Sequence, residues 1–407
     1  MAPVPTSTKQ PSNTSPGRAS PGGRVYDLIV VGAGGMGSAA AYHAARAGRR
    51  VLLVEQFQIG HTRGSSHGGS RIIRYTHDTT DYAAQMPATF QLWAELERAS
   101  GARLLQLTGG LYLGAADDPW LAACQSALSA LDFPYQHMEP AELRQAYPQF
   151  RLPDGWHGLY QANTGILAAS RCVETMVAQA VKHGAELREQ TQVSAVRPDG
   201  DGVAVALTSG ETLLAHRAVI AAGPWAQRLL RDLLPFAVPL RVTHQQVAYF
   251  PARDPAAFAV GVFPIFIASL LPHFYGFPIW ERPGALKLAV EQTTRVVDPD
   301  AERTIDEALL ADLAALVVAH LPDVDPTPVH VEPCLYTETP TRDFIIDRHP
   351  QYPQIVIAAG FSGRGFKHTI AIGQLLNDLA YSEPGVYASP FWLERYRLTR
   401  FVEASAL

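Results

Sequence analysis

The amino-acid sequence predicts a mixed α/β fold in which two domains are interleaved. The chain has 407 residues, whereas one ordinary domain has roughly 100–200. Hydrophobic residues make up 47% and charged residues 17%, which is typical of a soluble globular protein. An apolar run, an alanine-rich stretch and a second apolar run open the chain, and alternating apolar and polar residues dominate its middle.

The first three elements are a strand, a helix and a strand. Residues 27–31 are apolar and end at glycines, 32–48 are rich in alanine, and 51–54 are apolar again. Further helices are expected at 82–99, 120–131, 170–183, 305–320 and 365–381. Further strands are expected at 193–207, 218–223, 240–291 and 356–360. The strands of 240–291 predict a mostly β domain in the middle of the chain.

Two segments, residues 1–24 and 257–280, differ in composition from the rest of the chain. Residues 1–24 are rich in Pro, Ser, Thr and Gly and lack an apolar core, so we expect a disordered tail and no signal peptide. Residues 257–280 carry no charge and are long enough for a membrane span, but Pro264, Pro272 and His273 interrupt them. Two buried strands joined by a turn are the better interpretation, and no membrane partner is expected.

Charge and cysteine content restrict partners and compartment. The formal net charge of −5 gives no reason to expect a nucleic-acid partner. Cys124, Cys172 and Cys334 are too few and too far apart for a disulfide framework, which favours a cytoplasmic location. Residues 405–407 resemble a peroxisomal address only faintly, a weak alternative. No histidine spacing is typical of a metal site, so no metal is expected.

A glycine motif between the first strand and helix carries the first chemical signal. Gly32, Gly34 and Gly37 form the pattern GxGxxG, and Glu55 ends the second strand 18 residues after Gly37. Such glycines let the backbone approach a pyrophosphate at a helix N-terminus, while the acid accepts hydrogen bonds from ribose hydroxyls. A glycine turn can also serve packing alone, but this context predicts a Rossmann-type dinucleotide site. The motif does not distinguish NAD from FAD.

Several separated segments then agree in order and spacing with one family. They are 64–74 (GSSHGGSRIIR), 222–225 (AGPW), 334–337 (CLYT), 343–350 (DFIIDRHP) and 360–367 (GFSGRGFK). Taken alone, the first would be a basic surface loop. Together they resemble the sarcosine oxidase, pipecolate oxidase and N-methyltryptophan oxidase group of amine-oxidising flavoproteins, from about Val25 to the C-terminus. The resemblance implies FAD as the cofactor.

The resemblance assigns cofactor residues by position. Cys334 falls where the group bonds its sulfur to the methyl group of the flavin's benzenoid ring, although a lone cysteine is more often a small buried hydrophobe. Arg71 resembles the arginine beside the flavin ring, where it stabilises the anionic reduced form. The other implied cofactor residues are Ser65, His67, Ser70, Ile72, Val193, Gly223, Trp225, Gly363, Gly365, Phe366 and Lys367.

The same resemblance implies a substrate site. Arg74 and Lys367 resemble the pair that holds the substrate carboxylate, a suitable task for a guanidinium fork and an ammonium. The alternative for Lys367 is a solvated lysine on the last helix. Lys287 matches the lysine that promotes the reaction of the flavin with oxygen. Tyr275 and Tyr336 would lie on the substrate side.

One position departs from the family pattern. Four residues beyond Lys287, the sarcosine and pipecolate oxidisers have a histidine over the substrate, whereas this chain has Glu291. A carboxylate there would attract a cationic amine or bind hydroxyls, and it resembles the arrangement in fructosyl-amino-acid oxidases. The departure affects the identity of the substrate and leaves the flavin chemistry unchanged.

The prediction as a whole is an FAD-dependent oxidase of the C–N bond of a small secondary or cyclic amino acid. Its products would be an imine, which hydrolyses, and hydrogen peroxide. A fructosyl-amino-acid oxidase, a dehydrogenase that passes electrons to a carrier, and a flavin-binding partner subunit are the alternatives. A monomer is expected, with the amine and molecular oxygen as its partners.

The domain boundaries complete the prediction. We expect the FAD-binding domain to comprise residues 25–105, 166–235 and 331–407. The β-rich substrate domain would comprise 106–165 and 236–330, with a large antiparallel sheet that roofs the flavin.

Overall fold

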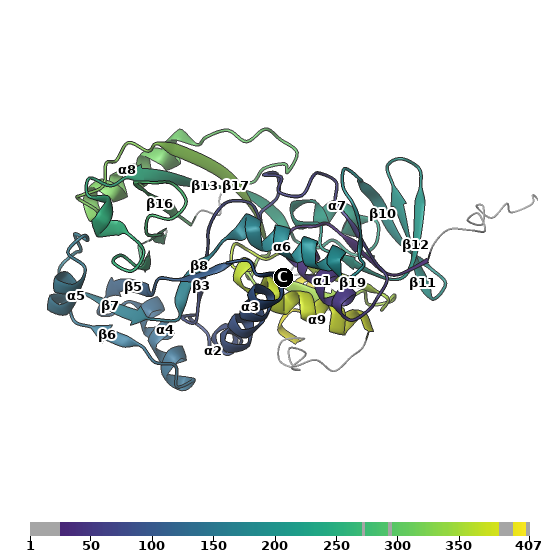
Figure 1. Ribbon diagram of the computed structural model, residues 1–407, viewed down its shortest axis with the longest axis horizontal. Coiled ribbons are helices and arrows are strands. Elements are labelled where there is room, and N and C mark those ends of the chain that lie inside the picture. Colours follow the sequence, from purple (N-terminus) through teal and green to yellow (C-terminus); the bar gives the residue numbers. More distant parts are fainter. Residues whose placement is uncertain (1–24, 271–272, 292–294, 382–393, 404–407) are drawn as a thin grey trace, which may run out of the picture.

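The computed structural model describes residues 25–270, 273–291, 295–381 and 394–403. The predicted tail at 1–24 and the C-terminal residues 405–407 lie outside this range. Two large sheets lie toward opposite ends of the long axis, with helices between and around them (Figure 1). Both the α/β class and the antiparallel second sheet were predicted from the sequence.

The first sheet has eight strands and contains the predicted nucleotide-binding unit. Its strands are β1 (Val25–Val31), β2 (Val51–Val54), β9 (Glu186–Arg188), β10 (Val193–Asp199), β11 (Gly202–Leu207), β12 (Thr212–Ile220), β18 (Ile345–Arg348) and β19 (Ile355–Ala359). β1 lies between β12 and β2 and is parallel to both. Because helices cover both faces of this parallel core, β1 and β2 are apolar along almost their whole length.

Helices α1 (Gly35–Arg46), α7 (Ala226–Arg231) and α9 (Thr369–Tyr381) pack directly on this sheet. Helix α6 (Ala169–Lys182) packs on α1, α3 (Met86–Ser100) packs on α9 and α6, and the short α2 (Thr80–Ala83) contacts α4 (Pro119–Ala130). Residues 35–45 of α1 are all buried, since α6 and α9 pack against it. Small residues permit this approach: a Cβ on Gly373 of α9 would lie 2.4 Å from the Cβ of Ala39.

The second sheet also has eight strands. They are β5 (Gly110–Ala115), β6 (Gln136–Met138), β7 (Trp156–Gln161), β13 (Arg241–Pro251), β14 (Ile265–Ala268), β15 (Phe274–Gly276), β16 (Ala285–Val290) and β17 (His330–Glu338). All neighbours in it are antiparallel except β14 and β5. The helices α4 (Pro119–Ala130), α5 (Pro140–Ala146) and α8 (Glu307–His320) belong to this part of the chain. A small third sheet joins β3 (Arg71–Arg74), β8 (Thr164–Leu167) and β4 (Leu105–Leu107).

Most predicted elements are confirmed to within a few residues. In the apolar stretch 257–280, β14 and β15 pair as buried antiparallel strands, although residues 271–272 of the connection are outside the described range. Among the described residues, no helix is long and apolar enough to cross a membrane. The domain boundaries stay a prediction. β17, from the range assigned to the FAD domain, pairs with β13 of the substrate range.

Candidate functional site

The glycine turn after β1 is built for close approach. Gly32 has a φ of +96°, and a Cβ on Gly37 would lie 1.7 Å from the carbonyl oxygen of Gly32. Side chains at these positions would therefore break the turn. Glu55 is buried, and its carboxylate accepts hydrogen bonds from the backbone N–H groups of Ala33 (2.8 Å) and Phe57 (3.0 Å). The acid thus holds the turn from the end of β2.

A long cavity begins at this turn. Most of the predicted cofactor residues line it, namely Gly32, Gly34, Glu55, Ser65, His67, Arg71, Val193, Gly223, Trp225, Gly363, Gly365 and Phe366. Gly37 supports the turn from within α1. The N-terminus of α1 opens on the cavity, and its first turn holds no acidic residue, so an anionic group is favoured there.

Orphaned polar atoms in this cavity indicate a ligand. The Ser65 and Thr337 hydroxyls and Nε2 of His67 are buried and have no hydrogen-bond partner in the part of the chain that the structure describes. Buried polar groups are normally satisfied. A dinucleotide, with a pyrophosphate and a polar ring system, offers both acceptors and donors for them. The residues present therefore fit the cofactor that the sequence predicts.

A second cavity continues from the first and brings the predicted substrate residues together. The two share His67, Arg71, Tyr336, Gly363 and Phe366. The predicted residues that line the second cavity alone are Ser70, Ile72, Arg74, Tyr275, Lys287, Glu291, Cys334 and Lys367. All predicted site residues except Gly37 therefore line one cavity or the other.

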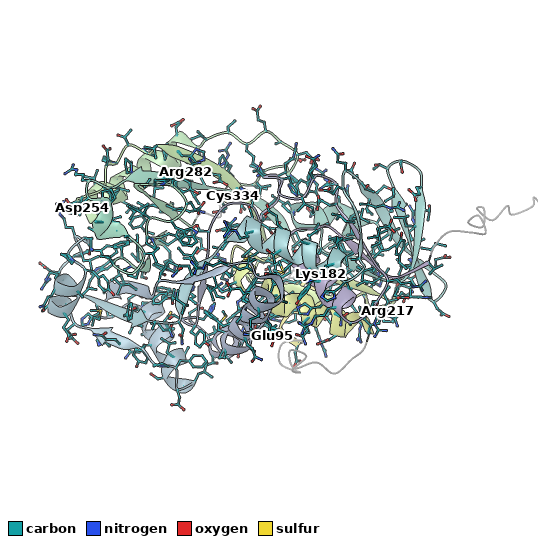
Figure 2. All side chains as sticks on the ribbon, in the orientation of Figure 1. Glu95, Lys182, Arg217, Asp254, Arg282 and Cys334 are labelled. Carbon is teal, nitrogen blue, oxygen red and sulfur yellow. The ribbon has the colours of Figure 1, made fainter. Side chains whose placement is uncertain are left out.

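Strand β17 supplies one wall of the second cavity by alternation. Glu332, Cys334 and Tyr336 are two residues apart, so their side chains lie on one face of the strand. Cys334 lies inside the molecule (Figure 2) and is 9% exposed, and its burial raises the pKa of the thiol. Burial likewise raises the pKa of Tyr275 and Tyr336, so both phenols stay protonated.

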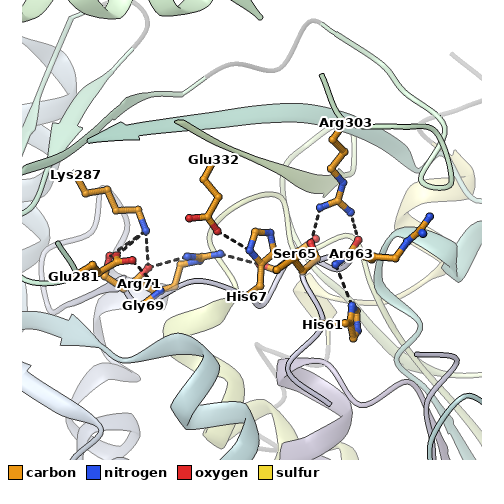
Figure 3. A network of polar contacts seen from close by, with 12 residues as sticks. His61, Arg63, Ser65, His67, Gly69, Arg71, Glu281, Lys287, Arg303 and Glu332 are labelled. Atoms are coloured by element: carbon orange, nitrogen blue, oxygen red, sulfur yellow. Dashed lines mark hydrogen bonds and ion pairs between the residues drawn. The ribbon is translucent and has the colours of Figure 1, made fainter. Parts of the chain in front are cut away.

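A buried ion pair fixes Lys287 (Figure 3). Its ammonium donates to Glu281 Oε1 at 2.9 Å and to the Ser70 hydroxyl at 3.1 Å. Oε2 of Glu281 accepts from the Tyr249 hydroxyl (2.7 Å) and from the Gly69 N–H (3.0 Å). Burial lowers the pKa of Lys287, and Glu281 opposes that shift. Burial also tends to raise the pKa of Glu281, but Lys287 and the hydrogen bonds lower it on balance.

A second network contains His67, Glu332, Arg71 and Ser65 (Figure 3), and both His67 and Arg71 line the two cavities. Nδ1 of His67 and Oε1 of Glu332 are 2.8 Å apart. This hydrogen bond lowers the pKa of Glu332 to about 2, whereas burial lowers the pKa of His67. A neutral His67 therefore donates to an ionised Glu332. Arg71 donates to the carbonyl oxygens of Ser70 (2.7 Å) and Ser65 (3.1 Å), which fixes its guanidinium beside both cavities.

Lys367 and Arg74 also line the second cavity. Lys367 follows β19 in the short helix η3 (Phe366–His368) and donates to the carbonyl oxygen of Arg364 at 2.8 Å. It is 6% exposed. Burial, followed by the charges of Arg74 and Arg364, lowers its pKa well below the usual range. An anion between Arg74 and Lys367 would relieve this repulsion.

Glu291 is ion-paired with Arg342. Burial tends to raise the pKa of Glu291, but the hydrogen bond from Arg342 and its charge lower it on balance. Arg342 also donates to the carbonyl oxygen of Ser362 at 3.3 Å. The charge of Glu291 is therefore offset within the cavity wall. His273, which sequence reasoning treated as a core residue, also lines this cavity, with its ring 4.8 Å from that of Trp120.

Sequence reasoning missed the partners of the charged residues, namely Glu281, Glu332, Arg342 and Arg364. Glu332 could have been found, since it lies two residues before Cys334 and so on the same strand face. Glu281 stands outside regular structure between β15 and β16, and the sequence carries no periodic signal for it.

The chain is similar to known flavoproteins in sequence and in fold. The model of the family described as FAD dependent oxidoreductase matches residues 27–379. The chain is 36% identical over 380 residues to the peroxisomal sarcosine oxidase of Homo sapiens, covering 91% of this chain and 96% of that protein. It is 34% identical to the monomeric sarcosine oxidase of Streptomyces avermitilis, covering 90% and 96%. A solved structure of NikD, an unusual amino acid oxidase essential for nikkomycin biosynthesis, superposes with a TM-score of 0.81 at 26% identity, covering 92% and 97%.

Proposed function

We infer that this chain, which belongs to the family of FAD-dependent oxidoreductases, oxidises the C–N bond of a small secondary or cyclic amino acid. The observation that carries this proposal is the second cavity. It is lined by Arg74, Lys367 and Lys287, and it shares five lining residues with the cavity that fits FAD. The names of the sarcosine oxidase relatives support the same reaction type.

The chain would hold FAD along the first cavity. The pyrophosphate would lie at the N-terminus of α1, and Glu55 would face the ribose. The ring system would reach the region shared by both cavities, beside Arg71 and Tyr336. Cys334 stands at this end, and we propose that its sulfur bonds covalently to the flavin.

Arg74 and Lys367 would hold the substrate carboxylate through a guanidinium fork and an ammonium. Tyr275 and Tyr336, both protonated, would border the amine. Because the cavity wall is rich in cations, it favours the uncharged amine over the ammonium form. When bound, FAD supplies the two-electron acceptor for the α C–H and passes the electrons to oxygen.

Lys287 would promote the reaction with oxygen. An ammonium at this position stabilises negative charge that develops on reduced oxygen. The ion pair with Glu281 favours the charged form of the lysine and opposes the lowering of its pKa by burial. A dehydrogenase would have no use for such a group.

The alternative substrate is a fructosyl amino acid, because the Glu291 carboxylate could bind its hydroxyls. In this structure Arg342 already engages Glu291, which favours the smaller amino acid. A monomer in the cytoplasm remains our proposal for the state of the protein. A peroxisomal location is the weaker alternative.

A peroxide-coupled assay of the purified yellow protein in air tests the function. Its substrates are sarcosine, pipecolate, proline, N-methyltryptophan and fructosyl amino acids. We expect peroxide from a secondary amino acid. Flavin bleaching under anaerobic conditions without peroxide in air would indicate the dehydrogenase, and turnover of fructosyl amino acids alone would assign the site to deglycation. Absence of bleaching by every amine would overturn the proposal.

A further inference from the structure

The second cavity contains more positive charge than one substrate carboxylate requires. Its cationic lining residues are Arg71, Arg74, Lys287, Arg342, Arg364 and Lys367, and its acidic ones are Asp78, Glu291 and Glu332. Two of the acids are already engaged, Glu291 by Arg342 and Glu332 by His67. The remaining acid, Asp78, forms no ion pair among the residues that the structure describes.

Four of the cations also stand without an acidic partner. Within the described ranges, no carboxylate oxygen lies within 4.0 Å of Arg71, Arg74, Arg364 or Lys367. Arg71 donates to backbone carbonyls beside the proposed flavin site, and Arg74 and Lys367 suit the carboxylate of an amino acid, as proposed above. Arg364 then remains as an unbalanced charge on a half-buried side chain in the same cavity lining, and an unpaired charge that is withdrawn from water is costly.

The donor atoms of these arginines are also incompletely used. Three buried donors, Nε of Arg364, Nε of Arg342 and Nη1 of Arg74, have no hydrogen-bond partner among the described residues. Among the residues that the structure describes, the guanidinium of Arg364 donates one hydrogen bond, from Nη2 to the carbonyl oxygen of Arg342 at 3.1 Å. Its guanidinium carbon lies 5.4 Å from the ring centroid of Tyr82, which holds the plane of the group but satisfies none of its N–H donors.

Arg364 and Lys367 belong to one turn after β19, because the Lys367 ammonium donates to the Arg364 carbonyl oxygen at 2.8 Å. Arg364 in turn reaches the backbone of Arg342. Arg342, Arg364 and Lys367 thus line the second cavity together with Arg74, and they are linked through the backbone carbonyl oxygens of Arg342 and Arg364. A second anion there would have charge partners separate from those of the first.

We propose that the substrate carries two acidic groups: one carboxylate on Arg74 and Lys367, and a second, on the side chain or the N-substituent, on Arg364 with Arg342 beside it. This proposal rests on the proposed function and names its substrate class. The enzyme would thus oxidise a dicarboxylic secondary amine. The low pKa of Lys367, to which Arg364 contributes, agrees with a wall that is completed by anions.

Binding of two unreactive analogues tests the proposal directly. In thiodiacetate and methylthioacetate a sulfur replaces the amine nitrogen, so neither compound can form an imine. Both are titrated into the flavin-loaded protein, and the flavin absorbance reports binding. We expect thiodiacetate to bind about tenfold more tightly, as a charge-assisted hydrogen bond allows. Equal or weaker binding of thiodiacetate in the wild-type protein overturns the proposal without recourse to any variant.

The variant Arg364→Gln locates the second subsite. It keeps a donor for the Arg342 carbonyl but removes the charge. We expect the preference for thiodiacetate to disappear, while the affinity for methylthioacetate stays within about threefold. Arg197→Gln, at an exposed position on β10, is the matched control and should retain the preference. A preference that survives in Arg364→Gln contradicts the assignment to this residue.

Turnover separates this proposal from the proposed function. N-methyl-L-aspartate and its neutral isostere N-methyl-L-asparagine are compared in the peroxide assay, and the acid should have the higher kcat/KM. If sarcosine bleaches the flavin but the acid and its neutral isostere have equal kcat/KM, the proposed function holds and the dicarboxylate proposal is wrong. If no amine bleaches the flavin and neither thioether binds, both fall together.

Discussion

At the scale of single residues, the chemistry of the second cavity depends on how each buried charge is balanced. Lys287 has Glu281, and Glu291 has Arg342. Removing one partner of a buried pair leaves an uncompensated charge, which costs more than the pair contributed. The counter-ion of a working lysine therefore controls its protonation.

Glu281→Gln should impair the step that depends on the Lys287 ammonium. Without the carboxylate, the pKa of Lys287 falls further, so the ammonium is present only at lower pH and is lost as pH rises through the new pKa. We expect reoxidation by oxygen to slow by about tenfold or more at neutral pH and to recover toward acidic pH. Stopped-flow measurement of both half-reactions checks this. Equal slowing of flavin reduction by the substrate would indicate a structural role instead.

Lys367 should make anion binding depend on pH. Its pKa is lowered by burial, Arg74 and Arg364, so the charged form exists below that lowered pKa, and the attraction for a carboxylate is lost as pH rises through it. The Kd of methylthioacetate should therefore increase with pH, by up to about tenfold per unit. In Lys367→Met the Kd of methylthioacetate should be higher than in the wild-type protein and nearly independent of pH. A flat profile in the wild-type protein would contradict the assignment.

Cys334→Ala tests the covalent bond. The proposal expects wild-type protein to remain yellow after acid precipitation, whereas the variant releases its flavin into the supernatant. A small buried side chain at this site should leave the fold intact, and far-UV circular dichroism serves as the control. Complete release of flavin from the wild-type protein would rule out the thioether.

At the scale of elements, the β1–α1 turn decides whether the cofactor can bind. A Cβ on Gly37 would overlap the carbonyl oxygen of Gly32, whereas on Gly34, with a φ of −68°, it would meet only the Ser66 hydroxyl at 3.5 Å. Gly37→Ala should therefore abolish FAD binding and destabilise the protein by about 2 kcal/mol or more. Gly34→Ala should fold normally, and its affinity for FAD should fall only if the pyrophosphate lies close to Gly34. Flavin content and Tm are the readouts, and an unchanged Gly37→Ala protein would refute the reasoning.

The helices and strands also show how much of the fold can be predicted from the sequence. The first strand, helix and strand were predicted because apolar spacing and glycine punctuation act locally. The short strands β4 to β8 were not predicted, since strands of three to six residues leave little periodic signal. Residues 257–280 were predicted as two strands because proline disfavours a continuous helix.

At the scale of the whole molecule, the first cavity draws its walls from distant parts of the chain. Gly32 lies in the turn that follows β1 of the first sheet, whereas Tyr336 and Thr337 come from β17 of the second. FAD should therefore stabilise both parts together. In Cys334→Ala, FAD at 100 times its Kd should add about 2.7 kcal/mol and raise Tm by several degrees. FMN, which lacks the adenylate half, is the control. An equal Tm with and without FAD would contradict this arrangement.

The sequence alone determined the nucleotide-binding unit, the family resemblance and most of the residues that line the cavities. These features depend on short motifs and local spacing. The tertiary structure decided which charges meet: His67 and Glu332 are separated by 265 residues, and Arg342 and Glu291 by 51. No local propensity encodes such a pairing. It follows from the tertiary arrangement, which brings the loop at His67 and the turn at Arg342 to strand β17 and to the end of strand β16 of the second sheet through long-range burial and hydrogen bonding.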